Sequence, residues 1–347
     1  MNSNHRMHEL GGGTKLITAE LADRVSASLV LMFGVGSSYE RESLGGISHF
    51  LEHLVFKGTE RRPGAKEVAE AIEGVGGVLN AWTDHEATAY WAKVPADQLH
   101  LAVDVLVDVV SRPRLMPEEL DREREVILEE LKMYLDQPEE YAHKLFEEIM
   151  WPAHALGRDI IGTEESIANF SPQNLADHLH QNYGLGNLVI GVCGGIDAES
   201  TINEIGSQLR SMSEARVPSG GPIPEPLSKA TVRVHHKESE QAHICLGMRG
   251  FSYLDPDRHA LDLLTTLLGE GMSSRLFLEI REQHALAYDV YAYTSKYRNA
   301  GYFGVSLGVD PAKAEEAVAR VHDELTKVIE SPVPESELRK VKEFNKG

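Results

Sequence analysis

Cysteine, long hydrophobic runs and targeting signals are scarce or missing in this sequence. Its two cysteines, Cys193 and Cys245, each lie in an apolar, strand-like run, so we expect two buried small hydrophobic residues rather than a disulfide. No stretch reaches the roughly 18 consecutive apolar residues that a membrane helix needs. The first twenty residues have neither the apolar core of a signal peptide nor the Arg-rich character of a mitochondrial presequence. We therefore expect a cytoplasmic protein that does not bind membranes.

Positive charge is also scarce. Lys and Arg total 34 against 54 Asp and Glu, which gives a net charge of −20. A protein of this charge repels nucleic acid and anionic lipid, so neither is expected as a partner, whereas basic peptides would be attracted. Hydrophobic residues make up 42% of the chain and charged residues 25%, as in ordinary soluble globular proteins.

The length of 347 residues suits two domains better than one. Residues 213–228 contain four prolines and two glycines, which interrupt every helical or strand pattern. We predict that this segment is a linker between an N-terminal domain, residues 1–212, and a C-terminal domain, residues 229–347.

The two halves show similar patterns. Each begins with a strand-like run, at 26–37 and 232–250, and continues through a polar loop into a long amphipathic segment. This order predicts two copies of one α+β unit, of which the second lacks a last helix pair and strand, so its C-terminal end is expected to be incomplete. Further strands are expected at 79–94, 188–195, 286–296 and 301–309, and helices at 64–75, 97–111, 117–136, 138–150, 172–182, 199–212 and 311–330.

His49, Glu52 and His53 form the pattern H-x-x-E-H in the segment GGISHFLEHLVFKG, which has one apolar face and ends at a glycine, as a short helix does. Two histidines four residues apart lie on one face of a helix and can bind one Zn²⁺. Glu52 lies on the neighbouring turn and would act as the general base toward a water that the metal activates. Because the chain has 16 histidines, the pattern also has some chance of arising without a metal.

A catalytic zinc site needs a third protein ligand. The best candidates lie in the strongly helical segment 117–136, where Glu123 and Glu130 are seven positions apart and so two turns apart on one face. A single glutamate in such a segment is usually a solvated charge. We give that interpretation to Glu118, Glu119, Glu125 and Glu129.

This order of residues resembles the inverted-zincin peptidases of the pitrilysin family, which includes insulysin and mitochondrial processing peptidase. In that family a ligand glutamate follows H-x-x-E-H after 76 residues, which correspond to positions 54–129 here and place the ligand at Glu130. Glu123 matches the family's second carboxylate, which would assist catalysis by orienting or polarising the site. The resemblance covers nearly the whole chain and is to the short type, like the processing peptidase beta subunit and its bacterial homologues.

The resemblance also implies substrate-binding residues. GGVLNAWTDHEATAYWAKV is similar to the family's edge strand, where the backbone around Asn80 and Ala81 would pair with an extended substrate. GEGMSSRLFLEIREQHALAYDVYAY is similar to the region that supplies a substrate-binding Arg and Tyr, here Arg281 and Tyr288. Without the resemblance, Arg281 would be a surface charge and Tyr288 a half-buried core residue. The commoner Arg-Gly-Leu-Ala-Tyr form is replaced by His-Ala-Leu-Ala-Tyr, so the turn before Tyr288 is expected to differ.

Together these features predict an α+β protein of two related domains, each a mostly antiparallel sheet with helices packed on one face. The resemblance implies a zinc metalloendopeptidase that hydrolyses unfolded peptides or presequence-like segments in a chamber between the domains. It also implies a homodimer, or a heterodimer with a homologous chain. The alternative is a non-catalytic structural or partner subunit of the same fold. Such subunits typically lose part of the metal motif or carry only one of the metal motif and the Arg-Tyr pair, whereas this chain has both.

Overall fold

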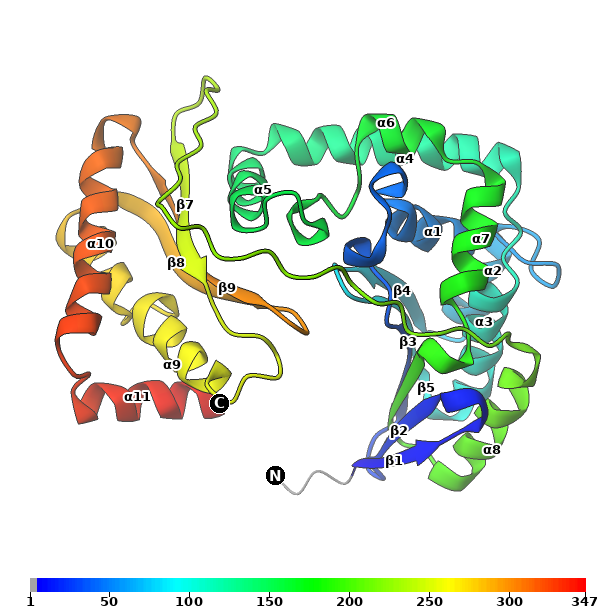
Figure 1. Cartoon of the computed structure of the whole chain (residues 1–347). Coiled ribbons are helices and arrows are strands. Elements are labelled where there is room, and N and C mark those ends of the chain that lie inside the picture. The colour runs from blue at the N-terminus through cyan, green and yellow to red at the C-terminus, as the bar shows by residue number, and fades with distance from the viewer. Residues whose placement is uncertain (1–4) are drawn as a thin grey trace. The chain divides into compact units, whose positions relative to one another are not determined.

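The computed structural model describes residues 5–347, without the side chain of Ser211. The chain forms two compact units, each with its own sheet (Figure 1). The first unit is Met1–Lys132 with Arg158–Gly221, and the second is Met133–Gly157 with Pro222–Gly347. Met133–Gly157 therefore groups with the second unit, although the sequence analysis placed this segment in the N-terminal domain. The reason is packing, because its apolar side chains join a core with tyrosines of the second half.

The first unit contains a six-stranded sheet in the order β1-β2-β6-β3-β5-β4. Only β2 and β6 run parallel, so the sheet is mostly antiparallel as predicted. The predicted strand 79–94 is instead two strands, because the Asp84 carboxylate accepts hydrogen bonds from the backbone N–H groups of Glu86 and Ala87 and closes a turn. The strands are β1 (His5–Glu9), β2 (Lys15–Glu20), β3 (Ser26–Phe33), β4 (Val78–Thr83), β5 (Thr88–Pro95) and β6 (Leu188–Gly194).

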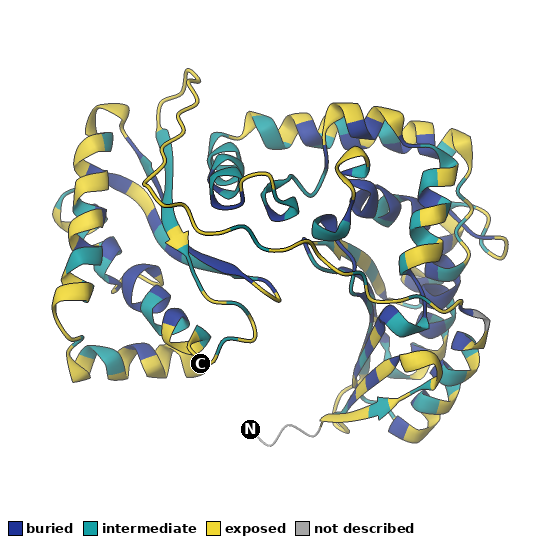
Figure 2. Cartoon of the chain, viewed as in Figure 1, coloured by how far each residue is buried: buried dark blue, intermediate teal, exposed yellow. Residues whose placement is uncertain are grey.

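Side chains alternate between the two faces of this sheet. On one face Leu16, Leu31 and Ile190 are at most 1% exposed, because the helices of the unit cover them (Figure 2). The other face, called the open face below, carries Cys193, which is exposed, so the expectation that both cysteines are buried was wrong for this residue. Cys245 is half-buried, and both thiols are free.

The helices of the first unit follow the predicted ranges closely. The main departure is a helix that ends at Gln208 rather than at 212, because the chain tightens into a 3-10 turn at Leu209–Ser211. Strands β1 and β2 and one short helix were not predicted. The helices are α1 (Ile47–Val55), α2 (Ala65–Glu73), α3 (Leu99–Ser111), α4 (Pro117–Asp136), α6 (Glu164–Asn169), α7 (Pro172–Asn182) and α8 (Ala198–Gln208).

The second unit contains three antiparallel strands in the order β7-β9-β8, which repeats the order β3-β5-β4 of the first unit. Helices α9 and α10 pack on one side, where α11 contacts α9, and α5 packs on the other side with Phe146 and Met150. The elements are α5 (Pro138–Met150), β7 (Ala242–Arg249), α9 (Arg258–Gly269), β8 (Ala287–Lys296), β9 (Gly301–Val309), α10 (Ala314–Glu330) and α11 (Glu335–Lys346).

Two predicted elements of this unit are shorter than expected. The strand predicted at 232–250 is regular only in β7, and residues 232–239 have no regular structure. The long amphipathic segment is interrupted after α9. A side chain at Gly269 would meet the backbone N of Ala292 at 2.0 Å, so the close contact of helix and strand requires glycine there. The chain then forms a wider π-helical turn, Phe277–Gln283.

Within residues 5–347, every helix is too short or too polar to cross a lipid bilayer.

The turn that begins α1 allows a test of the fold. Gly46 has a φ of 92°, and a Cβ there would lie 2.1 Å from the carbonyl oxygen of Ile161. Gly46→Ala should therefore lower the free energy of unfolding by more than about 1 kcal/mol, measured by urea denaturation. Gly206→Ala is the control, because Gly206 lies inside α8 with no atom within 4 Å of the added Cβ. That change should instead stabilise by about 0.5–1 kcal/mol, and equal effects of the two variants would contradict the assigned turn.

Candidate metal centre

Helix α1 is anchored at its N-terminus by a buried carboxylate. Glu40 accepts hydrogen bonds from the backbone N–H of Gly46, at 2.7 Å, and of Ser48, at 2.8 Å. These are donors that the start of a helix otherwise leaves free, and a negative charge there also interacts favourably with the helix dipole. Burial raises the pKa of Glu40, while hydrogen bonds from Ser48 and Gly46 and the nearby Arg158 oppose that shift. Glu40 was not identified from the sequence.

The apolar face of α1 fixes the direction of its histidines. Phe50, Leu51 and Leu54 are at most 1% exposed, so this face is held in the core. His49 and His53 are then presented together on another side of the helix, with ring centroids 4.8 Å apart.

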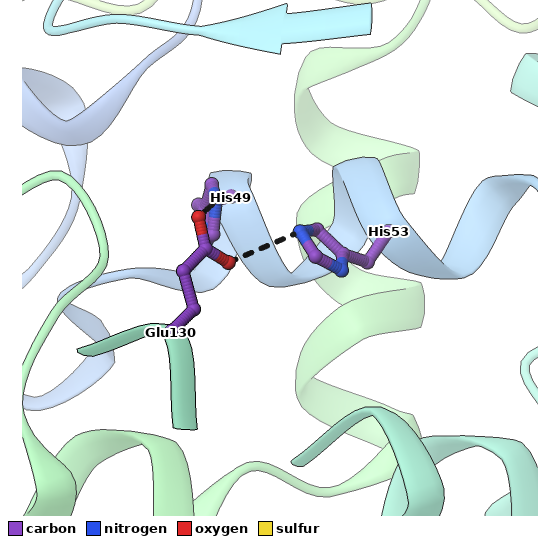
Figure 3. A group of neighbouring side chains, drawn as sticks. All are labelled: His49, His53 and Glu130. Carbon is purple, nitrogen blue, oxygen red and sulfur yellow. Dashed lines mark ion pairs between the residues drawn. The ribbon is translucent and has the colours of Figure 1, made fainter. Parts of the chain in front are cut away.

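Glu130 reaches these histidines from α4, as Figure 3 shows. One carboxylate oxygen lies 3.7 Å from Nε2 of His49, and the other lies 3.6 Å from Nε2 of His53. The three candidate ligand atoms all lie within 4.8 Å of one another. Among residues 5–347 no other group of three His, Cys, Asp or Glu side chains meets this criterion.

The donor set and its protonation fit a zinc ion. Two imidazoles and one carboxylate are ligands that zinc prefers, and bonds of about 2.0–2.2 Å to one ion require ligand atoms at roughly the separations found here. Burial, with a smaller effect of the His53 charge, lowers the pKa of His49 to about 4. The ring is therefore neutral at pH 7 and keeps a lone pair for a metal.

Glu123 contacts the nitrogen of His53 that faces away from Glu130. Its Oε2 lies 3.2 Å from Nδ1 of His53, and its Oε1 forms an ion pair with Nζ of Lys57 at 2.6 Å. A proton on Nδ1 that is donated to this carboxylate leaves Nε2, the atom facing Glu130, as the free acceptor. Burial raises the pKa of Glu123, but the hydrogen bonds from His53 and Lys57 outweigh burial and hold that pKa below its ordinary value. Glu123 thus orients His53, and its second partner, Lys57, was not identified from the sequence.

Glu52 lies on the same helix and contacts the sheet. Its Oε2 accepts a hydrogen bond of 2.6 Å from the hydroxyl of Thr83, the last residue of β4. Burial raises the pKa of Glu52, although the Thr83 bond and the His53 charge partly offset this effect. A carboxylate with a raised pKa is a better proton acceptor than an exposed one, as general base catalysis requires. Thr83 was not identified from the sequence, because only the fold brings β4 to α1.

The predicted edge strand is β4, which lies at one end of the six-stranded sheet. The backbone N–H of Ala81 is bonded to the Asn80 side chain of the same strand, at 2.8 Å in an exposed position. A polar side chain that covers an edge donor is a common way to protect an unpaired strand. Asn80 and Ala81 therefore lie on the same strand as Thr83, the partner of Glu52.

Arg281 and Tyr288 belong to the second unit and contact each other there. The Arg281 guanidinium carbon lies 4.7 Å from the centre of the Tyr288 ring and 4.8 Å from that of Phe277. Tyr288 is 76% exposed, so the interpretation as a half-buried residue was wrong. The pairing of β8 with β9 shifts register between Ala287 and Asp289, which makes Tyr288 the extra residue of a bulge and turns its side chain outward.

Two histidines outside this group have ordinary hydrogen-bond partners. Buried His85 bonds the Ser37 hydroxyl at 2.8 Å through Nδ1. His143 lies between the hydroxyls of Tyr291 and Tyr293, each 3.0 Å from one of its ring nitrogens. These contacts agree with packing roles.

The chain is similar to known proteins along nearly its whole length. Residues 15–164 match the family described as insulinase, peptidase family M16, and residues 169–345 match the peptidase M16 inactive domain. An uncharacterized zinc protease of Streptomyces coelicolor is 35% identical over 339 residues, which are 96% of this chain and 74% of that protein. An uncharacterized zinc protease of Bacillus subtilis is 35% identical over 322 residues, which are 93% of this chain and 78% of that protein.

Solved structures share the fold. A peptidase M16 inactive domain from Pseudomonas fluorescens superimposes with a TM-score of 0.94 at 20% identity, covering 99% of this chain and 84% of that chain. A protease from Helicobacter pylori gives a TM-score of 0.89 at 24% identity, with the same coverage. At these identities the likeness concerns the fold alone.

The ligand set predicts which residues hold the metal. Purified protein should contain close to one zinc per chain by elemental analysis, and His49→Ala or Glu130→Ala should lose most of it because two ligands do not form a stable site. Glu129→Ala is the matched control, since Glu129 is the neighbouring residue of α4, has 73% of its side chain exposed and pairs only with Lys132 among the described residues. Equal zinc content in the Glu129 and Glu130 variants would show that the third ligand is assigned incorrectly.

Proposed function

Because this chain belongs to the insulinase family of peptidases, family M16, which is the pitrilysin-type family that its motifs predicted, we propose that it is a zinc-dependent endopeptidase. The proposal rests mainly on the close grouping of His49, His53 and Glu130. The Glu52 carboxylate lies on α1, the helix of the two histidines. The names of the curated relatives, which include the words zinc protease, support the same metal.

The residues of the site have distinct roles. His49, His53 and Glu130 would hold the ion, and Glu123 would keep His53 in the tautomer that can bind it. A bound zinc ion supplies Lewis-acid chemistry, because it lowers the pKa of water and polarises a carbonyl group. Glu52 accepts the proton of the attacking water and later returns it to the leaving amine. Thr83 holds the Glu52 carboxylate toward β4 through its hydroxyl.

We propose that the substrate binds as an additional strand beside β4. The exposed N–H of Ala81 would exchange its bond with Asn80 for a bond with the peptide backbone. The scissile bond would then lie near Thr83 and Glu52, because Thr83 ends this strand and donates its hydroxyl to Glu52 of α1. Only an extended chain can pair in this way, so unfolded peptides should be cleaved and folded proteins spared.

The open face suggests which peptides bind well. Asn80 lies in register with Trp91, Val30, Gly191 and Ile17, in one row across β4, β5, β3, β6 and β2. Apart from Asn80 this row carries no polar side chain, and a strand added beside β4 would place alternate side chains on the same face. Apolar residues at alternate positions should therefore favour binding, and the net charge of −20 favours basic residues elsewhere in the peptide.

Arg281 and Tyr288 are proposed to bind the substrate from the second unit. Both lie in irregular segments, a π-helical turn and a β-bulge, and such irregularities are frequent at functional sites. The guanidinium can bind a peptide carbonyl, and the phenol can donate to that carbonyl or to the developing oxyanion. Their mutual stacking holds the two groups together, and the Glu282 carboxylate lies 3.9 Å from Nε of Arg281.

The competing function is that of a non-catalytic subunit of the same fold. The match of residues 169–345 to a domain described as inactive concerns the half of the chain without the metal motif. The first half retains both histidines, both glutamates of α4 and the Glu52 base in one cluster. A structural subunit has no need for this arrangement, so we favour catalysis.

The Glu52 base gives the main test of the function. Glu52→Gln should keep zinc and fold but reduce cleavage of an unfolded, fluorescence-quenched peptide by at least about 10²-fold, because an amide cannot accept the proton. Glu129→Gln is the control on an exposed position and should cleave at the parental rate. A Glu52→Gln protein that retains near-parental turnover would remove Glu52 from the mechanism, and a parental protein that binds zinc but cleaves nothing would favour the subunit role.

The second unit gives an independent test. Tyr288→Phe removes one hydroxyl from an exposed ring, so it should lower kcat more than it raises KM and leave zinc content unchanged. Arg281→Ala should mainly raise KM. Tyr253→Phe is the matched control, because Tyr253 is a 56% exposed tyrosine of the same unit with no proposed role. Unchanged kinetics in both variants of an active protein would show that the second unit has no chemical role.

A further inference from the structure

The two histidines of the candidate metal centre are held in different ways. His53 has the Glu123 carboxylate at its Nδ1, whereas the Nδ1 of His49 is buried and forms no hydrogen bond with any of residues 5–347. No hydrogen bond to the ring therefore selects the direction in which His49 presents Nε2 to Glu130. That direction depends on the first turn of α1, which carries His49, and on the packing around this turn.

A second helix contacts this turn. Helix α7 lies beside α1 in the first unit (Figure 1). Ser48, the residue before His49, is 0% exposed, and its hydroxyl oxygen lies 3.2 Å from Nε2 of His178 in α7. Glu40 accepts the backbone N–H groups of Gly46 and Ser48 at the same turn. The start of α1 is therefore bonded both to the preceding loop and to α7.

The proton positions in the contact with α7 follow from its neighbours. Nδ2 of Asn182 lies 2.9 Å from the backbone oxygen of His178, which can only accept, so this atom is the amide nitrogen. The same nitrogen lies 3.3 Å from Nδ1 of His178 and donates its other hydrogen there. Burial lowers the pKa of His178 to about 4, so at pH 7 the ring has one proton, on Nε2. His178 therefore donates to the hydroxyl of Ser48.

The donors form a series that runs from α7 to the start of α1. Asn182 donates to His178, and His178 donates to Ser48. The Ser48 hydroxyl then donates to the Glu40 carboxylate. Each oxygen of Glu40 also accepts a backbone N–H bond, so this carboxylate is the acceptor that ends the series. Because each group has a defined role as donor or acceptor, the series favours one arrangement of the turn that carries His49.

We propose that His178 is a positioning residue for the metal ligand His49. It acts through Ser48, by holding the first turn of α1 so that the His49 ring faces the other two ligands. His178 is not a ligand itself, because Ser48 and Asn182 occupy both of its ring nitrogens. The inference rests on the proposed zinc site, and it adds a determinant of zinc affinity that lies on a different helix from any of the ligands.

The alternative role of His178 is to stabilise the fold and nothing more. Its removal would then lower the free energy of unfolding, while the folded protein would bind zinc as tightly as before. If His178 positions His49, its removal also weakens zinc binding by protein that is fully folded, because part of the binding energy is spent on ordering the ligand. The zinc affinity of folded, metal-free protein therefore separates the two roles.

The test measures the Kd for Zn²⁺ in the 347-residue protein by competition with a chelating dye, where urea denaturation shows each metal-free variant to be folded. His178→Leu has a side chain of similar size without the donor, and its Kd should rise by about tenfold, as when groups that orient a ligand are lost. His178→Gln keeps an N–H donor and should restore most of the affinity. Thr201→Val is the control, because buried Thr201 likewise loses one hydrogen bond, to the backbone of Asp197, and its Kd should be unchanged.

A double-mutant cycle assigns the effect to the contact. Ser48→Ala should also raise the Kd, and the double variant with His178→Leu should bind no more weakly than the weaker-binding single variant, because both changes remove the same contact. A parental Kd in His178→Leu, no recovery in His178→Gln, or fully additive effects would overturn this inference alone. A parental protein that binds no zinc would overturn the proposed function together with it.

Discussion

The contact between His53 and Glu123 is the interaction on which the candidate metal centre depends. It joins α1 to α4 across 70 positions of sequence and determines which nitrogen of His53 faces Glu130. Lys57 supports the contact, because its ammonium group neutralises part of the charge that Glu123 carries into a largely buried position. Without Glu123, the tautomer of His53 would lose the hydrogen bond that selects it, and the two helices would lose their shortest histidine–glutamate contact. Glu40 fixes the start of α1 through two hydrogen bonds, and the buried apolar face fixes the rest of the helix. His53 is therefore held in a defined position opposite Glu123.

The candidate metal site and the proposed substrate edge are connected through the hydroxyl of Thr83. Thr83 ends β4 and donates to Glu52, so a hydrogen bond joins the proposed base to the proposed binding edge. The same strand carries Asn80, whose side chain covers the exposed N–H of Ala81 in the absence of a peptide. An edge strand that can be paired is a hazard for aggregation, and a polar cover of this kind keeps it available but protected.

The two units show how one topology supports different roles. The order β3-β5-β4 of the first unit recurs as β7-β9-β8 in the second, yet only the first unit has the H-x-x-E-H helix and the glutamates of α4. The second has irregular segments at the places that present Arg281 and Tyr288. Helix α5 accounts for part of this difference, because it covers a face of the second sheet whose counterpart in the first unit is the open face. The two units therefore share a topology but differ in chemistry, because the chemistry depends on the side chains and on the irregular segments that present them.

The sequence by itself determined the features that depend on residues close together in the chain, such as helix positions and the faces on which side chains lie. Helical spacing placed His49 and His53 on one face of α1, and the family resemblance singled out Glu130 and Glu123, which the structure brings to them. The apolar periodicities predicted most helices within a few residues. Tertiary structure alone decided the features that depend on partners distant in the chain. These are the bond from Thr83 to Glu52, the anchoring of α1 by Glu40, the grouping of α5 with the second unit and the exposure of Cys193 and Tyr288. A strand period shows that side chains alternate, but only the packing of helices shows which face is covered, and so which residues remain free to bind.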